Sequence, residues 1–231
     1  MMLDDRLFPS YVRTHAMTFD PERDGVGPRP LDVVLPAALG RAVPKRRAEF
    51  AAGRRCAREA LRALAPELVT DVAIGIHREP MFPAGAVGTI SHARAIAAAA
   101  VAPSTHAAGI GLDIEYWVTA AELAALDEQV LVQGEAPALE AQTGWTHARV
   151  ATFVFSAKET LYKCLFPTVQ TYFDFQDAEI ISIAPSEQRF EVRLRVPLAG
   201  GFLAGETFVG RFAIADDHVV TALVHEVRGP R

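Results

Sequence analysis

The chain is poor in cysteine, in long apolar runs and in any large excess of one charge. Its 231 residues include only two cysteines, Cys56 and Cys164, which lie in predicted helices among small or apolar neighbours and resemble buried hydrophobic residues. We therefore expect neither a disulfide framework nor a zinc cluster. No stretch approaches the roughly 18 apolar residues that cross a membrane, and the acidic start MMLDDRLFPS has no secretory signal. These absences predict a soluble, cytoplasmic protein with no membrane partner.

The charge of the chain is small overall but unevenly distributed. A formal net charge of −5, from 23 basic and 28 acidic residues, argues against a nucleic-acid-binding surface, so we expect no nucleic-acid partner. Residues 41–62 nevertheless contain eight basic residues and only two acidic ones. Arg54, Arg58 and Arg62 recur every four residues and share one face of a predicted helix, 45–64. Such a patch indicates either a compact, highly anionic ligand or a solvated helix face.

Half of the composition, 50%, is hydrophobic, which is enough for a substantial core. Short apolar runs bounded by glycine and proline predict strands before residue 117 and again after residue 178. Helical patterns precede or separate them at 45–64, 119–132 and 146–166. Because helix and sheet occur twice, we predict an α+β fold of two packed halves, residues 1–115 and 116–231, with a cleft between them.

One predicted strand carries two carboxylates on the same face. From Gly109 to Tyr116, apolar residues alternate with two glycines and then with Asp113 and Glu115. Since strand side chains alternate between faces, the glycines would let a ligand approach the backbone, and the acids would follow on the same side. Paired carboxylates suit Mg²⁺, which usually takes one or two of them and fills its other positions with water and phosphate oxygens. The alternative is an exposed face with solvated acids.

The helix predicted from Val150 carries Glu159 and Lys163 opposite its apolar stripe. That side also bears three aromatic residues: Phe155, Tyr162 and Phe166. A surface Glu–Lys pair at this spacing contributes only about 0.2–0.5 kcal/mol and leaves the aromatic residues unexplained. Charges among apolar groups mark a ligand, a metal or catalysis, although structural ion pairs also occur in such places.

Five blocks of the sequence resemble one family. Gly111-Leu112-Asp113-Ile114-Glu115 and the segment 155–163, FSAKETLYK, resemble the G-x-D-x-E and F-[SC]-x-K-E-x-x-x-K signatures of 4′-phosphopantetheinyl transferases. The likeness is to the branch that contains the surfactin-synthetase-activating enzyme and enterobactin synthetase component D. The segments 45–58, 78–92 and 166–178 resemble further blocks of that branch in the same order.

This resemblance implies a fold and an activity. Members fold as two similar α+β halves related by a pseudo-two-fold axis, with the active site in the cleft between them. They transfer the 4′-phosphopantetheine of coenzyme A to a serine of an acyl or peptidyl carrier protein and release adenosine 3′,5′-bisphosphate. The reaction uses Mg²⁺, or Mn²⁺ in its place. A site made by two halves of one chain needs no partner subunit, so we expect a monomer. The carrier would serve fatty acid, polyketide, siderophore or other nonribosomal peptide biosynthesis.

The resemblance also assigns roles to individual residues. Asp113, Glu115 and Glu159 would bind the metal, and Glu159 would be the base that removes the serine proton, with Glu115 as its alternative. Lys163 would stabilise or protonate the departing phosphate. The residues expected to contact coenzyme A are Arg46, Arg54, Arg78, Ser91, His92, Asp113, Lys158 and Lys163.

Two other classes would use the same residues. A Mg²⁺-dependent phosphohydrolase acting on a nucleotide needs similar acids and arginines. A non-catalytic module that binds coenzyme A or a carrier protein needs only the binding groups, and the intact Glu159 and Lys163 argue against it.

Overall fold

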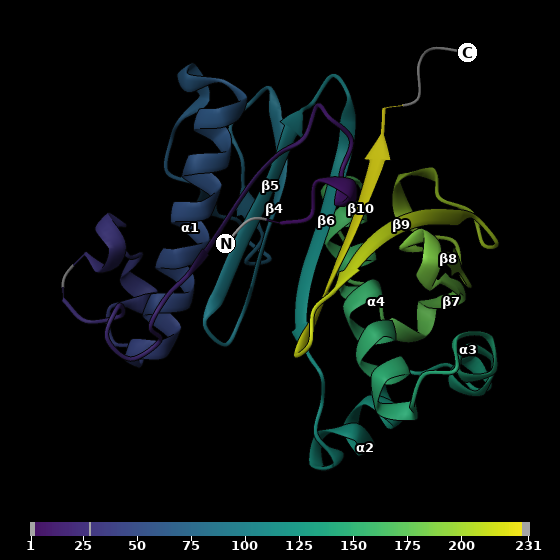
Figure 1. Ribbon diagram of the computed structural model, residues 1–231. Helices are drawn as coiled ribbons and strands as arrows, with labels where there is room; N and C mark the ends of the chain where they lie inside the picture. Colours follow the sequence, from purple (N-terminus) through teal and green to yellow (C-terminus); the bar gives the residue numbers. More distant parts are fainter. Residues whose placement is uncertain (1–2, 28, 228–231) are drawn as a thin grey trace. The chain divides into compact units, whose positions relative to one another are not determined.

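A computed structural model describes residues 3–27 and 29–227 of the chain, which form two compact units (Figure 1). Unit 1 contains Pro9–Ala107, and unit 2 contains Asp5–Phe8 and Ala108–Glu226, with the remaining ends of the chain counted in unit 1. Each unit combines helix and sheet, so the predicted α+β class in two parts is confirmed. The change of unit falls after Ala107, because the strand that follows pairs within unit 2. The division after residue 115 stays a prediction.

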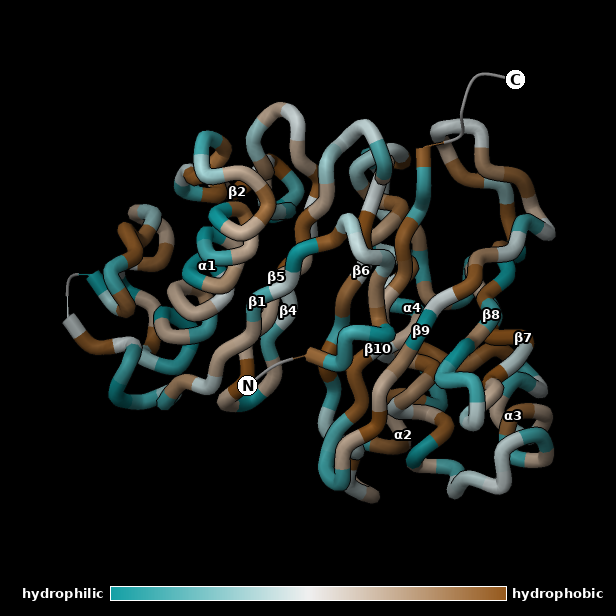
Figure 2. Tube along the Cα trace, turned by 45° about the horizontal axis from the view of Figure 1, so that its top comes forward, coloured by the Kyte–Doolittle hydropathy of each residue, from teal (hydrophilic) through white to brown (hydrophobic). Residues whose placement is uncertain are grey.

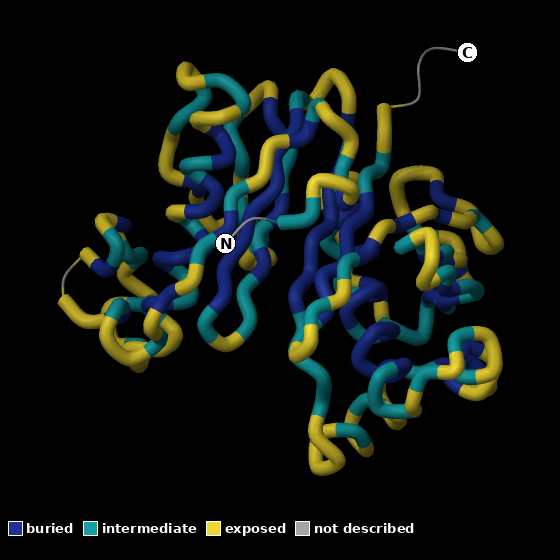
Figure 3. Tube along the Cα trace, in the orientation of Figure 1, coloured by how far each residue is buried: buried dark blue, intermediate teal, exposed yellow. Residues whose placement is uncertain are grey.

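Unit 1 is a helix packed on a three-stranded antiparallel sheet. The sheet has the order β1-β5-β4, and a two-stranded ladder joins β2 to β3. The elements are β1 (Arg13–Thr18), α1 (Pro44–Leu64), β2 (Ala73–Ile74), β3 (Pro80–Met81), β4 (Ala86–Ala93) and β5 (Ile96–Pro103). Figure 3 shows β5 buried along nearly all of its length.

Helix α1 begins with Pro44 in its first turn, where the missing N–H has no intrahelical partner to lose. Figure 2 shows hydrophilic residues interrupting weakly hydrophobic ones along it, and the buried ones are mostly alanines. Small side chains let the helix lie close to the sheet. A Cβ on Gly53 would stand only 2.7 Å from Cγ2 of Ile90 on β4, so glycine is required at this contact.

Unit 2 is a five-stranded sheet covered by helices. Its strand order is β6-β10-β9-β8-β7, and the strands from β7 to β10 pair antiparallel with their neighbours. The elements are β6 (Ala107–Tyr116), α2 (Ala120–Gln129), α3 (Glu135–Thr143), α4 (His147–Val169), β7 (Ala178–Ala184), β8 (Arg189–Leu194), β9 (Thr207–Ile214) and β10 (His218–Glu226). Short 3₁₀ turns occupy Asp5–Leu7, Pro30–Asp32, Ala37–Leu39, Pro66–Leu68, Phe175–Asp177, Pro185–Glu187 and Ala199–Gly201.

The apolar stripe predicted for α4 is completely buried in the core of unit 2. Phe153 on this stripe packs edge-to-face on Phe190 and Phe212, with ring centroids 5.6 and 4.9 Å apart. The helix continues to Val169 instead of stopping before Pro167, because a proline so close to the end removes one hydrogen bond of the last turn only. In the described part of the chain, no helix combines the length and the apolar character needed to cross a membrane.

The two glycines of β6 serve the packing of α4. A Cβ on Gly109 or Gly111 would lie 1.9 Å from the carbonyl oxygens of Cys164 and Thr160, respectively. The backbone of α4 therefore rests against this face of the strand. The sequence pattern predicted that a ligand approaches the backbone at these glycines, and the structure corrects that prediction. The close approach brings the middle of α4 beside the acidic end of β6.

Candidate active site

A pocket of about 430 Å³ lies in unit 1 between α1, the β2–β3 hairpin and β4. It brings together four of the predicted coenzyme A ligands, which come from three separate elements of the unit. Its lining consists of Ala38, Leu39, Arg46, Glu49, Phe50, Gly53, Arg54, Ile74, Arg78, Pro80, Ile90 and His92. The pocket thus combines three arginines and a histidine with apolar side chains from both the helix and the strands. Of the arginine series predicted on one face of α1, only Arg54 reaches this pocket.

Arg54 is the most constrained cation of the pocket. Its guanidinium lies 4.7 Å from the ring centroid of Phe50, and its Nη2 donates to the Ala73 carbonyl over 3.2 Å. Its Nε is buried without a hydrogen-bond partner among the described residues. Burial, with a smaller contribution from the neighbouring positive charge of Arg46, lowers the pKa of Arg54 to about 10. A desolvated guanidinium with an unused donor favours an anionic ligand.

Two further arginines stand at the pocket with more freedom. Arg46 lies 3.5 Å from Oε2 of Glu49, one turn along α1; its side chain is 53% exposed, whereas that of Glu49 is 13% exposed. Arg78 lies in the turn between β2 and β3 with a φ of +69°, a left-handed conformation that a non-glycine residue rarely adopts. The turn is closed by the Arg78 amide, which donates to the Gly75 carbonyl over 3.0 Å. This geometry carries the Arg78 side chain to the pocket.

A second cluster lies in unit 2, where α4 rests on β6. Nζ of Lys163 donates to Oδ1 of Asp113 over 2.6 Å and stands 4.0 Å from Oε2 of Glu159. The Asp113 side chain is 4% exposed, whereas those of Lys163 and Glu159 are 25% and 30% exposed. The carboxylate that β6 contributes is therefore buried, whereas the charged side chains from α4 are partly exposed to solvent.

The electrostatics of this cluster reflect an excess of carboxylates. Burial and the charge of Asp113 raise the pKa of Glu115 to about 8. Burial also raises the pKa of Glu159, with Asp113 adding to the effect. Burial would lower the pKa of Lys163, but Asp113 and Glu159 outweigh it, so that pKa is raised and the ammonium stays charged. Three acids around one ammonium form a site that favours an additional cation.

The carboxylates fit a weakly held hard cation and not a preassembled cage. Within residues 3–27 and 29–227, no three His, Cys, Asp or Glu side chains form a group that could hold a metal ion by themselves. Asp113, Glu115 and Glu159 nevertheless offer only oxygen donors, and Mg²⁺ commonly takes one or two carboxylates and completes its shell with water and phosphate. The donor chemistry therefore fits Mg²⁺ when substrate oxygens are present.

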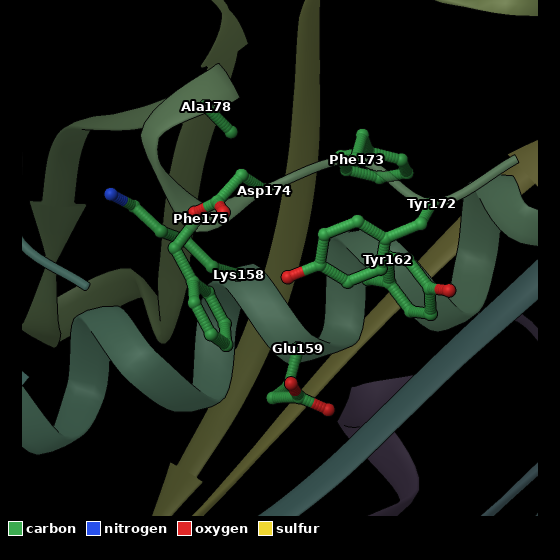
Figure 4. A pocket seen from close by; sticks show the side chains of 8 residues that line it. All are labelled: Lys158, Glu159, Tyr162, Tyr172, Phe173, Asp174, Phe175 and Ala178. Atoms are coloured by element: carbon green, nitrogen blue, oxygen red, sulfur yellow. The ribbon is translucent and has the colours of Figure 1, made fainter. Parts of the chain in front are cut away.

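A smaller pocket, of about 160 Å³, lies beside Glu159 (Figure 4). The Tyr162 ring lies 5.1 Å from the Phe173 ring and 5.9 Å from the Tyr172 ring, measured between centroids. The lining residues are Lys158, Glu159, Tyr162, Tyr172, Phe173, Asp174, Phe175 and Ala178. The pocket is mainly aromatic, with one carboxylate of the acidic cluster at its edge.

Comparison with known proteins decides the family. A 4′-phosphopantetheinyl transferase N-terminal domain matches residues 35–102, and the 4′-phosphopantetheinyl transferase superfamily matches residues 109–222. The 4′-phosphopantetheinyl transferase Svp of Streptomyces mobaraensis is 34% identical over 94% of this chain and 87% of its own length. The chain belongs to the 4′-phosphopantetheinyl transferase family.

Two other relatives extend the comparison of this phosphopantetheinyl transferase. The transferase PptT of Mycobacterium tuberculosis (strain ATCC 25618 / H37Rv) is 32% identical, and the match covers 87% of each chain. Enterobactin synthase component D of Escherichia coli O157:H7 is 37% identical over 63% of this chain and 66% of its own. The predicted family and enzyme class, transfer of phosphopantetheine to carrier proteins, are confirmed.

Two predicted ligands of the transferase lie away from their expected partners. Ser91 falls between Ile90 and His92 on β4, so its side chain projects to the opposite, buried face, and it does not line the unit 1 pocket. Lys158 is 2% exposed, and its ammonium donates to Oε2 of Glu135 over 2.8 Å. These positions do not favour the predicted contacts of Ser91 and Lys158 with coenzyme A.

Several residues of both sites in this transferase were not predicted from the sequence. Phe50, whose ring stacks on Arg54, was not among the candidate site residues. Glu135 had no sequence signal, because its partner Lys158 lies far along the chain. The aromatic run at 172–175 was the one available signal for the smaller pocket, since three aromatic residues directly follow a helix end there.

Proposed function

We propose that this transferase moves the 4′-phosphopantetheine of coenzyme A onto a serine hydroxyl of an acyl or peptidyl carrier protein. The bond between the phosphorus and the bridging oxygen of the pyrophosphate breaks, a serine O–P bond forms, and adenosine 3′,5′-bisphosphate leaves. The observation that carries the proposal is the presence of two charge clusters of opposite sign in one chain. One is a basic pocket with a desolvated arginine, and the other is a carboxylate cluster around Lys163.

The basic pocket suits the nucleotide end of coenzyme A. Arg46, Arg54, Arg78 and His92 would bind its phosphate oxygens, and a guanidinium can bond two of them at once. The apolar side chains of the same pocket would suit the heteroaromatic base of that nucleotide. Desolvation of the Arg54 guanidinium would strengthen its attraction for an anion in this pocket.

Asp113, Glu115 and Glu159 would hold Mg²⁺, or Mn²⁺ in its place. When bound, the ion supplies charge neutralisation at the phosphoanhydride. Lys163, held by Asp113, would stabilise the departing phosphate with its positive charge, which its raised pKa preserves.

Glu159 is our candidate for the base that accepts the serine proton. Its side chain is 30% exposed, and its raised pKa brings a carboxylate closer to the pH at which it would work. Glu115 is the alternative, because its pKa of about 8 also suits proton transfer. The aromatic pocket beside Glu159 would receive the uncharged amide arm of the substrate, which aromatic faces accommodate without charged partners.

A direct test incubates the purified protein with coenzyme A, Mg²⁺ and an acyl or a peptidyl carrier, and records intact carrier masses. The expected result is addition of one phosphopantetheine to one serine, lost with EDTA and restored by Mg²⁺ or Mn²⁺. Release of adenosine bisphosphate without any carrier would instead identify a phosphohydrolase. Coenzyme A binding without release would identify a binding module.

The carriers to include follow from the relatives. Enterobactin synthase component D suggests a siderophore peptidyl carrier, and carriers of fatty acid and polyketide synthesis provide the comparison. We further propose that the enzyme works as a monomer in the cytoplasm, since both charge clusters belong to one chain. A single species at the mass of one chain in light scattering is the expected result.

A further inference from the structure

Glu135 is a buried carboxylate that the proposed reaction does not use. It is 2% exposed, at the start of α3. Its Oε2 accepts hydrogen bonds of 2.8 Å from Nζ of Lys158 and from the Val132 amide, and its Oε1 accepts one of 2.6 Å from the Ile180 amide. One side chain thus ties together α4, β7 and the turn before α3.

The partner of Glu135 is the residue next to the proposed base. Lys158 donates a further hydrogen bond of 2.8 Å to the Val130 carbonyl, so its ammonium is enclosed by acceptors of the 130–135 segment. Figure 4 shows the ammonium of Lys158 pointing away from the carboxylate of Glu159. Only the apolar stem of Lys158 is left to line the small pocket.

Glu135 holds two parts of the lining of that pocket in place, one on α4 and one at the start of β7. Lys158 forms one wall from α4, and Ala178 forms another at the start of β7. The bond from Ile180 fixes β7 two residues beyond Ala178. Nε2 of Gln176 adds a second tie to the same segment by donating to the Leu131 carbonyl over 3.1 Å.

Without Glu135, the buried ammonium of Lys158 would lose the one carboxylate that pairs with it among the described residues. A buried charge that loses its partner is strongly destabilised and turns to the nearest alternative. Asp174 and Glu159 are the carboxylates among the residues that line the small pocket. The ammonium would then turn into this pocket, beside the proposed base.

We propose that Glu135 is a positioning residue for the transfer reaction. It holds the ammonium of Lys158 out of the pocket beside Glu159, and so keeps the pocket open and the Glu159 carboxylate available to substrate. The inference rests on the proposed function of the Glu159 site.

The test compares Glu135→Gln, Lys158→Met and the double variant Glu135→Gln/Lys158→Met with the wild-type chain, measuring kcat and KM for coenzyme A. Wild-type transfer establishes the function itself, and the ratios among variants test the inference. We expect Glu135→Gln to lower kcat at least tenfold with a KM within threefold. The double variant should have a kcat at least fivefold above that of Glu135→Gln and within threefold of that of Lys158→Met, because neither of these two chains has an ammonium to misplace.

Three outcomes would overturn the proposal. Glu135→Gln with unchanged kcat would remove its premise. A double variant as slow as Glu135→Gln would make Glu135 purely structural. A KM raised tenfold by Lys158→Met would make Lys158 a direct ligand of coenzyme A. If Glu135→Gln does not fold, Glu135→Asp replaces it: this shorter carboxylate should lower kcat about fivefold at unchanged KM, and an unchanged kcat would again contradict the proposal.

Discussion

The buried cations of the two units differ in their hydrogen-bond partners. In unit 1, Arg54 is desolvated, stacked on Phe50, and has one donor without a partner among the described residues. In unit 2, Lys158 is more deeply buried, but Glu135 and a backbone carbonyl accept its hydrogen bonds. The first arrangement leaves a buried nitrogen without an acceptor among the described residues, whereas the ammonium of the second has a carboxylate and a carbonyl as acceptors and joins separate elements of the fold. A buried cation without a carboxylate partner is therefore the better candidate for binding an anion.

The carboxylate cluster should show the largest effect on catalysis. We expect Glu159→Gln to reduce the rate of phosphopantetheine transfer about 10²- to 10⁴-fold, because a neutral amide cannot accept the serine proton. The KM for coenzyme A should change little. Single-turnover transfer followed by intact mass is the measurement, and Glu128→Gln, an exposed site on α2, is the matched control. A Glu159→Gln rate within threefold of the wild type would exclude this residue as the base.

The Glu135–Lys158 pair should show the largest effect on stability. Glu135→Ala leaves a buried ammonium without a carboxylate, which costs about 3–5 kcal/mol of the free energy of unfolding. Glu191→Ala breaks the more exposed pair with Arg189 and should cost about 0–1 kcal/mol. Urea denaturation of both variants gives the comparison. Equal losses would contradict the distinction between complete buried pairs and surface pairs.

Arg54 should matter for substrate binding more than for stability or turnover. Hydrogen bonds to charged groups contribute about 1.5–3 kcal/mol, so Arg54→Ala should raise the KM for coenzyme A about 10- to 100-fold with kcat nearly unchanged. Arg54→Lys keeps the positive charge but lacks the planar guanidinium, so its KM for coenzyme A should lie between those of the wild type and Arg54→Ala. Steady-state kinetics at saturating carrier are the check. An unchanged KM for Arg54→Ala would remove this residue from the phosphate site.

His147 provides the smallest effect, at a cluster outside either pocket. Its ring nitrogens lie 2.6 Å from Glu140 and 2.8 Å from Asp127, and the bond to Glu140, followed by that to Asp127, raises its pKa against the opposing effect of burial. The stabilisation is present below the unfolded pKa of about 6.5 and disappears as pH rises through the higher folded pKa. Because the His147 side chain is 41% exposed, we expect at most about 1 kcal/mol. Unfolding of the wild type and His147→Gln from pH 5 to 9 measures it; a difference that grows with pH would contradict the sign.

The sequence predicted the elements whose patterns are local. The alternation in β6 and the apolar stripe of α4 are periodic, so the strand, the helix and their charged residues were predictable. Helix α3 was missed because Gly134 and Gly144 resemble a loop. In the structure these glycines flank helix α3: Gly134 precedes its first residue with a φ of +83°, and Gly144 follows its last residue with a φ of +71°.

The missed contacts depend on tertiary structure. The glycine face of β6 meets α4 instead of a ligand, and no pattern in the sequence distinguishes the two. Glu135 and Lys158 are 23 positions apart, and no periodic pattern in the sequence relates one to the other. The position of Ser91 was predictable, however, since strand alternation places it opposite His92.

Binding of adenosine 3′,5′-bisphosphate tests most directly whether unit 1 binds the phosphates while the carboxylates of unit 2 serve the chemistry. Calorimetric titration of the wild type, Arg54→Ala and Glu159→Gln without metal gives the three dissociation constants. We predict at least tenfold weaker binding for Arg54→Ala and binding within threefold of the wild type for Glu159→Gln. Equal weakening of both variants, or loss in Glu159→Gln alone, would contradict the account.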